Sequence, residues 1–249
     1  MDGRLDLSRC SVLDPGVDVG RRSSAATASA RSARRKVIEC CEGLEIKNIS
    51  YVKRKRIIDI FSSGLALILL LPVFIVLALA VKITSPGPVF YRSFRVGRGG
   101  QLFPFVKFRS MRADADKVLE KLQTQNEKDG PIFKMKRDPR ITPIGRFLRK
   151  YSLDELPQLW SVFVGHMSMV GPRPPIPREV EHYDDFAKRR LTVKPGITCY
   201  WQIMGRSNLT FEEWMALDNR YIDEMSFWTD IKIIAKTPKA ILFPGDSAY

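Results

Sequence analysis

One apolar segment constrains this chain more than any other feature of its sequence. Residues 57–81 form a run of 25 residues whose only charged side chain is Asp59. A straight helix of that length would be roughly 37 Å long, against a bilayer core of about 30 Å, so the segment is long enough to enter or cross a membrane. It is too long, and begins too far from the N-terminus, for an ordinary secretory signal.

Pro72 interrupts this segment, because proline cannot donate a backbone hydrogen bond to the carbonyl of Ile68 and clashes with it. The arms on either side would be about 22 Å and 14 Å long, and neither crosses the core alone. Both flanks are basic, with Lys53–Arg56 before the segment and Lys82 after it, and the positive-inside rule disfavours exporting either end. The residues leave open a kinked spanning helix, a re-entrant hairpin and, less favoured, a buried core helix.

The rest of the composition indicates one substantial folded domain and a polar tail. The 249 residues are 45% hydrophobic and 27% charged, which excludes wholesale disorder and a small fold that depends on metals or disulfides. Residues 1–50 show no apolar period and include the stretch SSAATASARSARR, so we expect a flexible basic tail. The net charge of +14 attracts polyanions, namely nucleic acid, anionic lipids or phosphorylated substrates. A nucleic-acid-binding protein would not need 25 apolar residues beside a basic cluster, so we expect no nucleic-acid partner.

The pattern becomes typical of a globular protein after Thr84. Ser85-Pro86-Gly87-Pro88 is a rigid break, and residues 89–111 alternate apolar and basic residues around a Gly-Gly turn, which predicts a hairpin with a cationic face. The expected helices are an amphipathic one over 112–128, two short ones with a break within 138–165, one over 211–225 and one over 228–243, the last lying on a membrane surface.

The adjacent carboxylates Asp154 and Glu155, within SLDELPQLW, are the most informative polar pair. A helix tolerates Pro157 only in its first turn, so we expect both carboxylates at a helix N-terminus. One interpretation is capping, because Asp is a good N-cap and Ser152 with Glu155 fits the capping-box spacing. The other is catalytic: a carboxylate beside free backbone N–H groups can act as a nucleophile or bind Mg²⁺, while the same helix end holds a phosphate.

Cationic side chains form the second candidate group. Arg binds phosphate through two hydrogen bonds at once, and Lys binds it as a mobile point charge. Arg173 is the most distinctive, because prolines on both sides restrict its backbone and a rigid mount suits a phosphate clamp. Asp218 is either an ordinary residue of a soluble helix or part of a polar site. The other candidates, each also compatible with a solvated surface, are Lys107, Arg109, Arg146, Arg149 and Lys194.

The sequence has no pattern typical of zinc or of a Ser- or Cys-based hydrolase. His166 and His182 are too few and too scattered for a zinc site, and neither a G-x-S-x-G motif nor a P-loop lysine motif is present. The cysteines lack metal-ligand spacing, which favours free thiols in a reducing compartment: Cys10, Cys40, Cys41 and Cys199.

An ordered set of motifs makes the sequence recognisable. In chain order they are KRIIDIFSSGLALILLLPVF, KITSPGPVFYRSFRVGRGGQLFPFVKFRSM, RITPIGRFLRKYSLDELPQLWSVFVGHMSMVGPRP, KPGITCYWQIMGR and LDNRYID. This set, over roughly residues 53–249, resembles the bacterial sugar transferase family, the monotopic phosphoglycosyl transferases. The order and length of the set are highly specific, unlike any one motif.

The resemblance implies transfer of a hexose 1-phosphate from a UDP-sugar to a polyprenyl (undecaprenyl) phosphate, with release of UMP, as the initiating step of exopolysaccharide or other surface glycan synthesis. The family's Asp-Glu pair falls on Asp154 and Glu155. Asp154 would then be the nucleophile, and both carboxylates would serve Mg²⁺, with Mn²⁺ as the alternative ion. The predicted substrate-binding residues are Lys107, Arg109, Arg149, Arg173 and Asp218.

The resemblance also implies an α+β fold with a re-entrant helix that enters and leaves on the cytoplasmic face of the inner membrane. Family members bend this helix at a Ser-Pro pair, whereas the pair here is Leu71-Pro72. We therefore expect a tail over residues 1–50, a kinked membrane helix over 51–84 and a cytoplasmic transferase domain over 85–249. Because only a polar tail precedes that core, the chain is similar to a minimal form of the family.

The alternatives are a catalytically inert membrane scaffold of the same fold and an enzyme that transfers the hexose without its phosphate. The intact Asp154-Glu155, Lys107 and Arg173 argue against a scaffold. The expected partners are a UDP-sugar, polyprenyl phosphate and membrane lipids, and a homodimer is left open. Neither the hexose nor the polymer can be inferred, because epimers that differ at one hydroxyl leave no readable motif.

Overall fold

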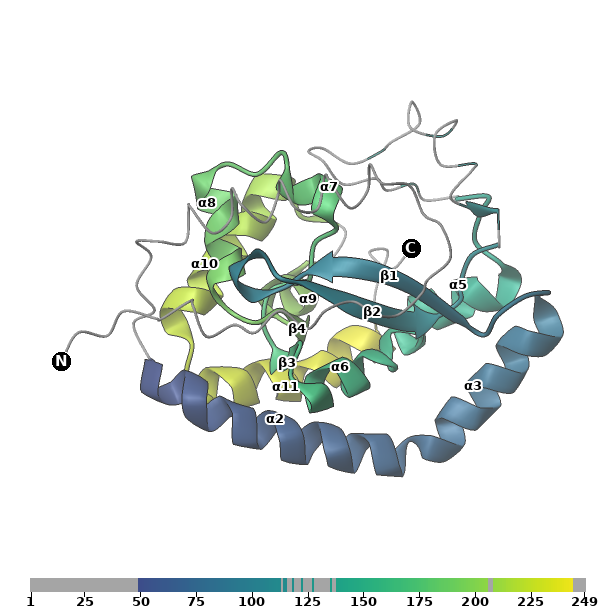
Figure 1. Cartoon of the computed structure of the whole chain (residues 1–249), viewed down its shortest axis with the longest axis horizontal. Coiled ribbons are helices and arrows are strands. Elements are labelled where there is room, and N and C mark those ends of the chain that lie inside the picture. The colour runs from purple at the N-terminus through teal and green to yellow at the C-terminus, as the bar shows by residue number, and fades with distance from the viewer. Residues whose placement is uncertain are drawn as a thin grey trace.

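The computed structural model describes residues 49–112, 138–205 and 208–243, together with isolated positions between 114 and 135 (Figure 1). Nearly all of the predicted tail over residues 1–50, and most of the predicted helix over 112–128, lie outside the described residues. Both therefore stay predictions.

Two helices joined at a bend run along one side of the molecule (Figure 1). They are α2 (Ile49–Leu69) and α3 (Leu71–Thr84), and they meet at 61°. Pro72 lies in the first turn of α3, where a missing backbone N–H costs nothing, so the predicted bend is confirmed. Neither helix by itself has the length and apolar content to cross a membrane, but the bent pair together meets that requirement by length and composition.

The predicted hairpin is present as β1 (Phe90–Val96) and β2 (Leu102–Phe108), which pair in an antiparallel register. The turn between them contains a short 3₁₀ helix, η2 (Arg98–Gly100), and Gly99 has a φ of 62°, which a glycine adopts without strain. Side chains alternate between the two faces of the hairpin. As a result the cations that the sequence groups together are divided between an inward and an exposed face.

The two short helices predicted within residues 138–165 are α5 (Pro143–Lys150) and α6 (Gln158–Val164). The Thr142 side chain caps α5 by accepting a hydrogen bond from the Gly145 N–H at 3.0 Å. A separate 3₁₀ turn, η4 (Leu153–Glu155), lies between the two helices. The predicted break is therefore confirmed, and the Asp-Glu pair lies within it.

Two three-residue strands, β3 (Ser168–Val170) and β4 (Gly196–Thr198), form a parallel pair that the sequence does not reveal. Strands this short carry no periodicity. A Cβ atom on Gly196 would lie 2.0 Å from the Gly171 nitrogen, so the KPGIT segment needs glycine where the two chain segments touch. The remaining elements are α7 (Pro177–Val180), α8 (Asp185–Lys188), η5 (Arg189–Thr192), α9 (Tyr200–Met204), α10 (Phe211–Glu224) and α11 (Phe227–Leu242).

The predicted α+β class fits this arrangement of many helices with two small sheets. One apolar cluster joins α3 to the hairpin and α5 through Leu77, Val81, Phe108 and Leu148. Another joins the parallel strands to α10 and α11 through Val170, Cys199, Tyr221, Ile222 and Ile233. The α2–α3 pair is thus packed against the rest of the protein at both of its ends.

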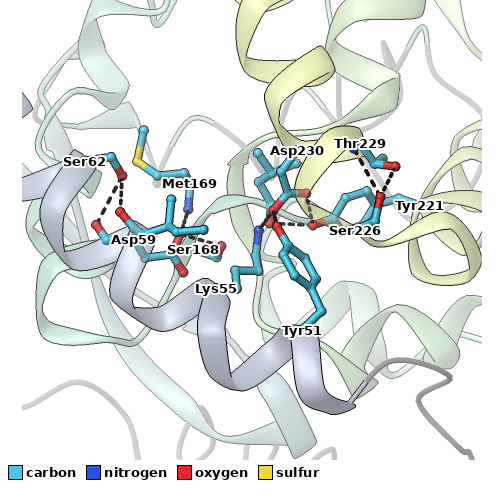
Figure 2. Close-up of polar contacts among 12 residues, drawn as sticks. Tyr51, Lys55, Asp59, Ser62, Ser168, Met169, Tyr221, Ser226, Thr229 and Asp230 are labelled. Carbon is cyan, nitrogen blue, oxygen red and sulfur yellow. Dashed lines mark hydrogen bonds and ion pairs between the residues drawn. The ribbon is translucent and has the colours of Figure 1, made fainter.

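Polar contacts fasten the first half of α2 to the C-terminal part of the chain (Figure 2). Asp230 of α11 accepts hydrogen bonds from the Tyr51 hydroxyl at 2.6 Å and the Tyr221 hydroxyl at 2.8 Å, and it pairs with the Lys55 ammonium. Asp59 accepts from the Ser168 hydroxyl and from the next backbone N–H, both at 2.9 Å. The only charge in the apolar segment is therefore buried and hydrogen-bonded within the protein.

This docking corrects one expectation about the basic cluster Lys53–Arg56, which the sequence presents as a single membrane-proximal run. Lys53 and Arg54 are exposed. Lys55 is only 8% exposed. Arg56 donates to the carbonyl oxygens of Val162 and Phe163 at 2.6 and 2.7 Å. Two of the four cations therefore bind other parts of the protein.

Candidate active site

The Asp-Glu pair is held in a strained turn between α5 and α6. Ser152, which precedes the turn, has φ 52° and ψ 23°, and it is the only residue other than glycine with positive φ among those described. Backbone strain of this kind persists where the surrounding structure enforces it and is concentrated at functional sites. The turn buries Asp154 to 6% exposure and leaves Glu155 half-buried.

The capping interpretation of this pair is not supported by the geometry. Pro157 is the residue that precedes α6, so both carboxylates lie before the helix and not within its first turn. The Ser152 side chain makes no capping hydrogen bond. Something other than helix capping must therefore account for a buried carboxylate at residue 154.

The hairpin brings two cations to the carboxylates. Tyr91 lies opposite Lys107 in the register, and Arg95 shares their face because it is four residues from Tyr91. The Lys107 ammonium lies 5.5 Å from the centre of the Tyr91 ring and interacts electrostatically with both carboxylates, Asp154 and Glu155. Arg95 packs its guanidinium 4.9 Å from the centre of the Phe105 ring.

Two further arginines complete the cluster. Arg149, from the last turn of α5, and Arg173, which follows β3, both interact electrostatically with the hairpin cations or with Glu155. The Arg173 guanidinium lies 5.6 Å from the centre of the Trp214 ring and 3.5 Å from the Glu179 carboxylate. We name the group Lys107, Arg95, Arg149, Arg173, Asp154 and Glu155 the Asp154 cluster.

Crowding of charge perturbs the protonation equilibria of this cluster. Burial, and then the neighbouring Asp154 carboxylate, raises the pKa of Glu155. Burial lowers the pKa of Lys107 to about 8, although the two carboxylates oppose the shift. Burial and the Arg173 charge lower the pKa of Arg95 to about 10. Perturbed groups that share one site are typical of functional sites.

Several polar atoms in and around the cluster are buried without a hydrogen-bond partner among the described residues. They include Nε of Arg95, Nη1 of Arg149, Nε2 of Gln158 and Nε1 of Trp214, all of which are donors. Unpaired buried donors are rare in native proteins, and a group of them requires an explanation. A ligand rich in acceptor oxygens, such as a phosphate, would satisfy them.

Asp218 lies in a second layer behind Arg173. Its side chain is completely buried on α10, and Oδ2 lies 2.7 Å from the terminal nitrogen of Arg190. Arg190 also donates to the Arg173 carbonyl oxygen at 2.9 Å. Burial raises the pKa of Asp218 to about 6, with the Arg190 charge opposing the shift. This arrangement suits a residue that fixes the Arg173 loop.

Three of the cationic sequence candidates are not part of the cluster, and one of them, Arg146 on α5, is exposed. Arg109 donates to the Pro86 carbonyl oxygen at 2.7 Å and to the Ser85 carbonyl oxygen at 2.5 Å. It thereby fixes the segment between α3 and β1, and substrate binding by Arg109 stays a prediction. Lys194 precedes β4 and interacts electrostatically with Arg56, Asp59 and Arg98 instead.

The structure adds Arg95, Arg190 and Trp214 to the residues that the sequence singled out. Arg95 could have been found, because a hairpin with a Gly-Gly turn places residues 91, 95 and 107 on one face. Arg190 gave no signal, since it follows another arginine in a short irregular segment. Its role depends on a partner 28 positions later in the chain, Asp218.

Comparison with known proteins assigns the chain to a family. A model of the family described as bacterial sugar transferase matches residues 50–244. The chain belongs to the bacterial sugar transferase family. Every residue of the Asp154 cluster lies inside the matched range, so the cluster is part of the sugar transferase core.

Relatives of this chain include proteins of several bacteria. It is 47% identical over 194 residues to the galactosyl transferase CpsE of Streptococcus agalactiae, an alignment that covers 78% of this chain and 43% of CpsE. It is 44% identical over 202 residues to the undecaprenyl-phosphate galactose phosphotransferase of Salmonella typhimurium, covering 78% and 41%. It is 40% identical over 191 residues to the exopolysaccharide production protein ExoY of Rhizobium meliloti, covering 75% and 84%. The chain thus spans less than half the length of the first two relatives.

The Asp154 cluster offers oxygen ligands to a metal ion. Within the described part of the chain, no three His, Cys, Asp or Glu residues lie together in a way that could hold a metal. Asp154 and Glu155 supply a pair of adjacent carboxylates. Mg²⁺ is commonly held by one or two carboxylates together with substrate phosphates, so the donor set fits Mg²⁺ bound with a phosphorylated substrate.

Proposed function

We propose that this protein transfers a hexose 1-phosphate from a UDP-hexose to a polyprenyl phosphate and releases UMP. The observation that carries the proposal is the Asp154 cluster, in which a buried carboxylate lies among four cations whose donors are partly unsatisfied. A diphosphate supplies the acceptor oxygens that these donors need. A relative from Escherichia coli, 43% identical over 192 residues, is named a UDP-glucose:undecaprenyl-phosphate glucose-1-phosphate transferase, and UDP-glucose carries such a diphosphate.

In the proposed reaction, a carboxylate oxygen of Asp154 attacks the phosphorus that carries the hexose. A bond forms between that oxygen and the phosphorus, the bond to the bridging oxygen breaks, and UMP leaves with the electron pair. A phosphate oxygen of the polyprenyl phosphate then attacks the same phosphorus and restores the Asp154 carboxylate. One small site can in this way serve a water-soluble donor and a lipid acceptor in turn.

The surrounding residues provide positioning and charge stabilisation in this scheme. Lys107, Arg149 and Arg173 neutralise the diphosphate, which makes UMP a better leaving group without strong acid-base chemistry. Arg190 and Asp218 hold the Arg173 loop, as the contact between Arg190 and the Arg173 carbonyl indicates. Asp218 is then a positioning residue and not one that touches the reacting phosphorus.

We assign Mg²⁺, with Mn²⁺ as an alternative, to Asp154 and Glu155. When bound, the ion would supply positive charge to the diphosphate of the donor. The pKa of Glu155 is raised by burial and then by the Asp154 carboxylate, and this repulsion supports the assignment because a cation would stabilise two close carboxylates. Full turnover in excess chelator would contradict it, whereas loss of turnover that Mg²⁺ or Mn²⁺ restores is the expected result.

We place the enzyme at the inner membrane, with α2 and α3 as a re-entrant pair and the rest of the protein on the cytoplasmic face. Polar residues near the start of α2 bond to Asp230, Ser168 and Met169, all of which follow α3 in the chain. A spanning arrangement would separate these partners across the bilayer. The exposed apolar side chains near the bend support insertion, among them Phe61, Leu65, Ile68, Leu69, Leu71, Val76 and Leu79.

Cysteine labelling in intact membranes tests this topology. Cys199 is buried, so reporter cysteines belong at exposed positions in a background with Cys10, Cys40 and Cys41 replaced by Ser. The positions are Lys53→Cys near the start of α2 and Glu212→Cys after the pair. We expect both reporters to react only after the cytoplasmic face is opened to the reagent. Labelling from opposite faces would overturn the re-entrant arrangement.

The activity itself is tested with membranes that contain the protein, polyprenyl phosphate and a panel of UDP-sugars that includes UDP-galactose and UDP-glucose. Release of UMP together with a polyprenyl diphosphate sugar is the expected result. Release of UDP would instead indicate transfer of the hexose alone. A panel that yields neither nucleotide would indicate an inert scaffold.

A further inference from the structure

A small cavity lies against the start of α2, away from the Asp154 cluster. Its volume is about 40 Å³, and its walls carry four cations, Lys55, Arg56, Arg98 and Lys194, but only one carboxylate, Asp59. A cavity needs roughly 10–15 Å³ for one water-sized group. The cavity therefore has room for about three water-sized groups, which is close to the size of a phosphate.

Apart from Lys194, the charged groups in the wall interact with other parts of the protein. Lys55 pairs with Asp230, and Asp59 accepts the hydrogen bonds from Ser168 and Met169. The Lys194 ammonium has no hydrogen-bond or ion-pair partner within the described part of the chain. Burial lowers its pKa, the charges of Arg56 and Arg98 lower it further, and the Asp59 carboxylate opposes the shift. With four cations against one carboxylate in its wall, the cavity carries an excess of positive charge.

The parallel strand pair separates this cavity from the proposed reaction centre. The carboxyl ends of β3 and β4 lead to Arg173 and to Cys199, which interacts electrostatically with Asp218. The amino ends of the same strands present Ser168 and Lys194 to the cavity. Strands β3 and β4 therefore carry two cationic sites at opposite ends.

The cavity also lies at the polar end of the exposed apolar band of α2. Ile57, directly after Arg56, is 58% exposed, and Phe61, one turn further, is 75% exposed. In a membrane-associated helix, basic residues that flank an apolar face lie at the depth of the lipid headgroups. A phosphate at that depth could come from a phospholipid or from solution.

We propose that the cavity lined by Arg56, Arg98 and Lys194 is a second anion site that takes a phosphate group, distinct from the site that holds the UDP-hexose. Arg56 is fixed by the two carbonyl oxygens at the end of α6, so Lys194 is the group that adapts to the ligand. An occupied site would link α2 to the hairpin turn and to the KPGIT segment.

The test follows the acylation rate of Lys194 in the full-length protein by mass spectrometry. An anion close to an amine raises its pKa by about 1–3 units, which lowers the reactive neutral fraction about tenfold or more. The protein is placed in phosphatidylcholine vesicles alone, in vesicles that also contain phosphatidylglycerol, and in the first vesicles with inorganic phosphate. The exposed Lys150 in the same protein reports general changes in reactivity.

We expect at least tenfold slower labelling of Lys194, with Lys150 unchanged, in at least one of the two anionic conditions. Slowing by phosphatidylglycerol assigns the site to a lipid headgroup, and slowing by inorganic phosphate alone assigns it to a soluble anion. Equal rates in all three conditions, or parallel slowing of Lys150, would overturn the proposal.

A pair of hairpin variants supplies the matched control. Arg98→Gln should abolish the protection of Lys194, whereas Arg92→Gln, on the exposed face of the same hairpin, should leave it intact. Protection that survives Arg98→Gln would contradict the assignment. Binding is measured without turnover, so the result is independent of whether the proposed transferase activity is found.

Discussion

Two buried groups of charged residues in this protein differ in how completely their polar atoms are paired. The cluster that docks α2 is centred on Asp230, whose two oxygens accept from Tyr51, Lys55 and Tyr221. The Asp154 cluster contains Arg95 and Arg149 nitrogens that are buried without a partner among the described residues. Paired polar groups stabilise a fold, whereas unpaired ones are retained for something that binds.

Local geometry follows the same division. The docking residues lie on regular helices, α2, α10 and α11. The Asp154 cluster is assembled from a strained turn, a hairpin face, the last turn of α5 and the loop after β3, with Ser152 in the left-handed region. The comparison therefore separates residues whose loss should affect stability from residues whose loss should affect turnover.

The largest effect is expected from Asp154→Asn. The substitution keeps the size of the side chain but removes the anionic nucleophile, so turnover should fall by about 10³-fold or more while the melting temperature changes little. UMP release and thermal unfolding of the purified protein measure the two quantities. If Asp154→Asn retained substantial turnover, the carboxylate would have to be a structural or metal-binding group.

Asp230→Asn should show the opposite behaviour. It leaves Lys55 buried without its anion, so the free energy of unfolding should fall by about 3–5 kcal/mol. The exposed pair of Arg189 with Asp223 provides the control, because Asp223→Asn should cost at most about 1 kcal/mol. Denaturant unfolding distinguishes the variants, and equal losses would remove the distinction between docking and surface pairs.

Protonation of Asp218 should make kcat/KM fall at acidic pH. Because its pKa is raised to about 6, the carboxylate is anionic above that pH and becomes neutral below it, where Arg190 and Arg173 lose their counter-charge. We expect kcat/KM for the UDP-sugar to fall about tenfold per pH unit below 6. In Asp218→Asn, kcat/KM should be low at every pH and should show no such fall below pH 6. If the fall persisted in that variant, another group would have to be responsible for it.

The smallest effect concerns the strained turn. Ser152→Ala and Ser152→Gly both remove the hydroxyl, but only glycine adopts the left-handed backbone at no cost. The alanine variant should be less stable than the glycine variant by about 1 kcal/mol, whereas in a regular helix alanine would be the more stable. Thermal unfolding shows directly which of the two variants is the more stable.

Sequence reasoning predicted the elements that carry a local signal. The bend at Pro72, the hairpin with its Gly-Gly turn, the two short helices around the Asp-Glu pair and the helix over 211–225 are confirmed. Each is defined by a proline, a glycine turn or an apolar period within about twenty residues. The helix over 228–243 is also confirmed as α11, while its placement on a membrane stays a prediction.

Contacts distant in the chain could not be predicted in the same way. Lys55 and Asp230 are separated by 175 positions, and no property of the apolar segment indicates that its first half docks onto the last helix. The strands β3 and β4 have three residues each, too few for a period. Lys194 resembles the other candidate phosphate ligands in sequence, and only the direction of β4 places it at the opposite end.

The most direct test of the account measures the intact mass of the protein after incubation with the UDP-hexose donor and no acceptor lipid. A two-step mechanism requires release of about one UMP per enzyme and a gain of one hexose phosphate on the peptide that contains Asp154. Addition of polyprenyl phosphate should then remove the added mass and yield the lipid-linked sugar. Absence of any adduct under single-turnover conditions, or an adduct on a residue other than Asp154, would contradict the assignment of Asp154 as the nucleophile.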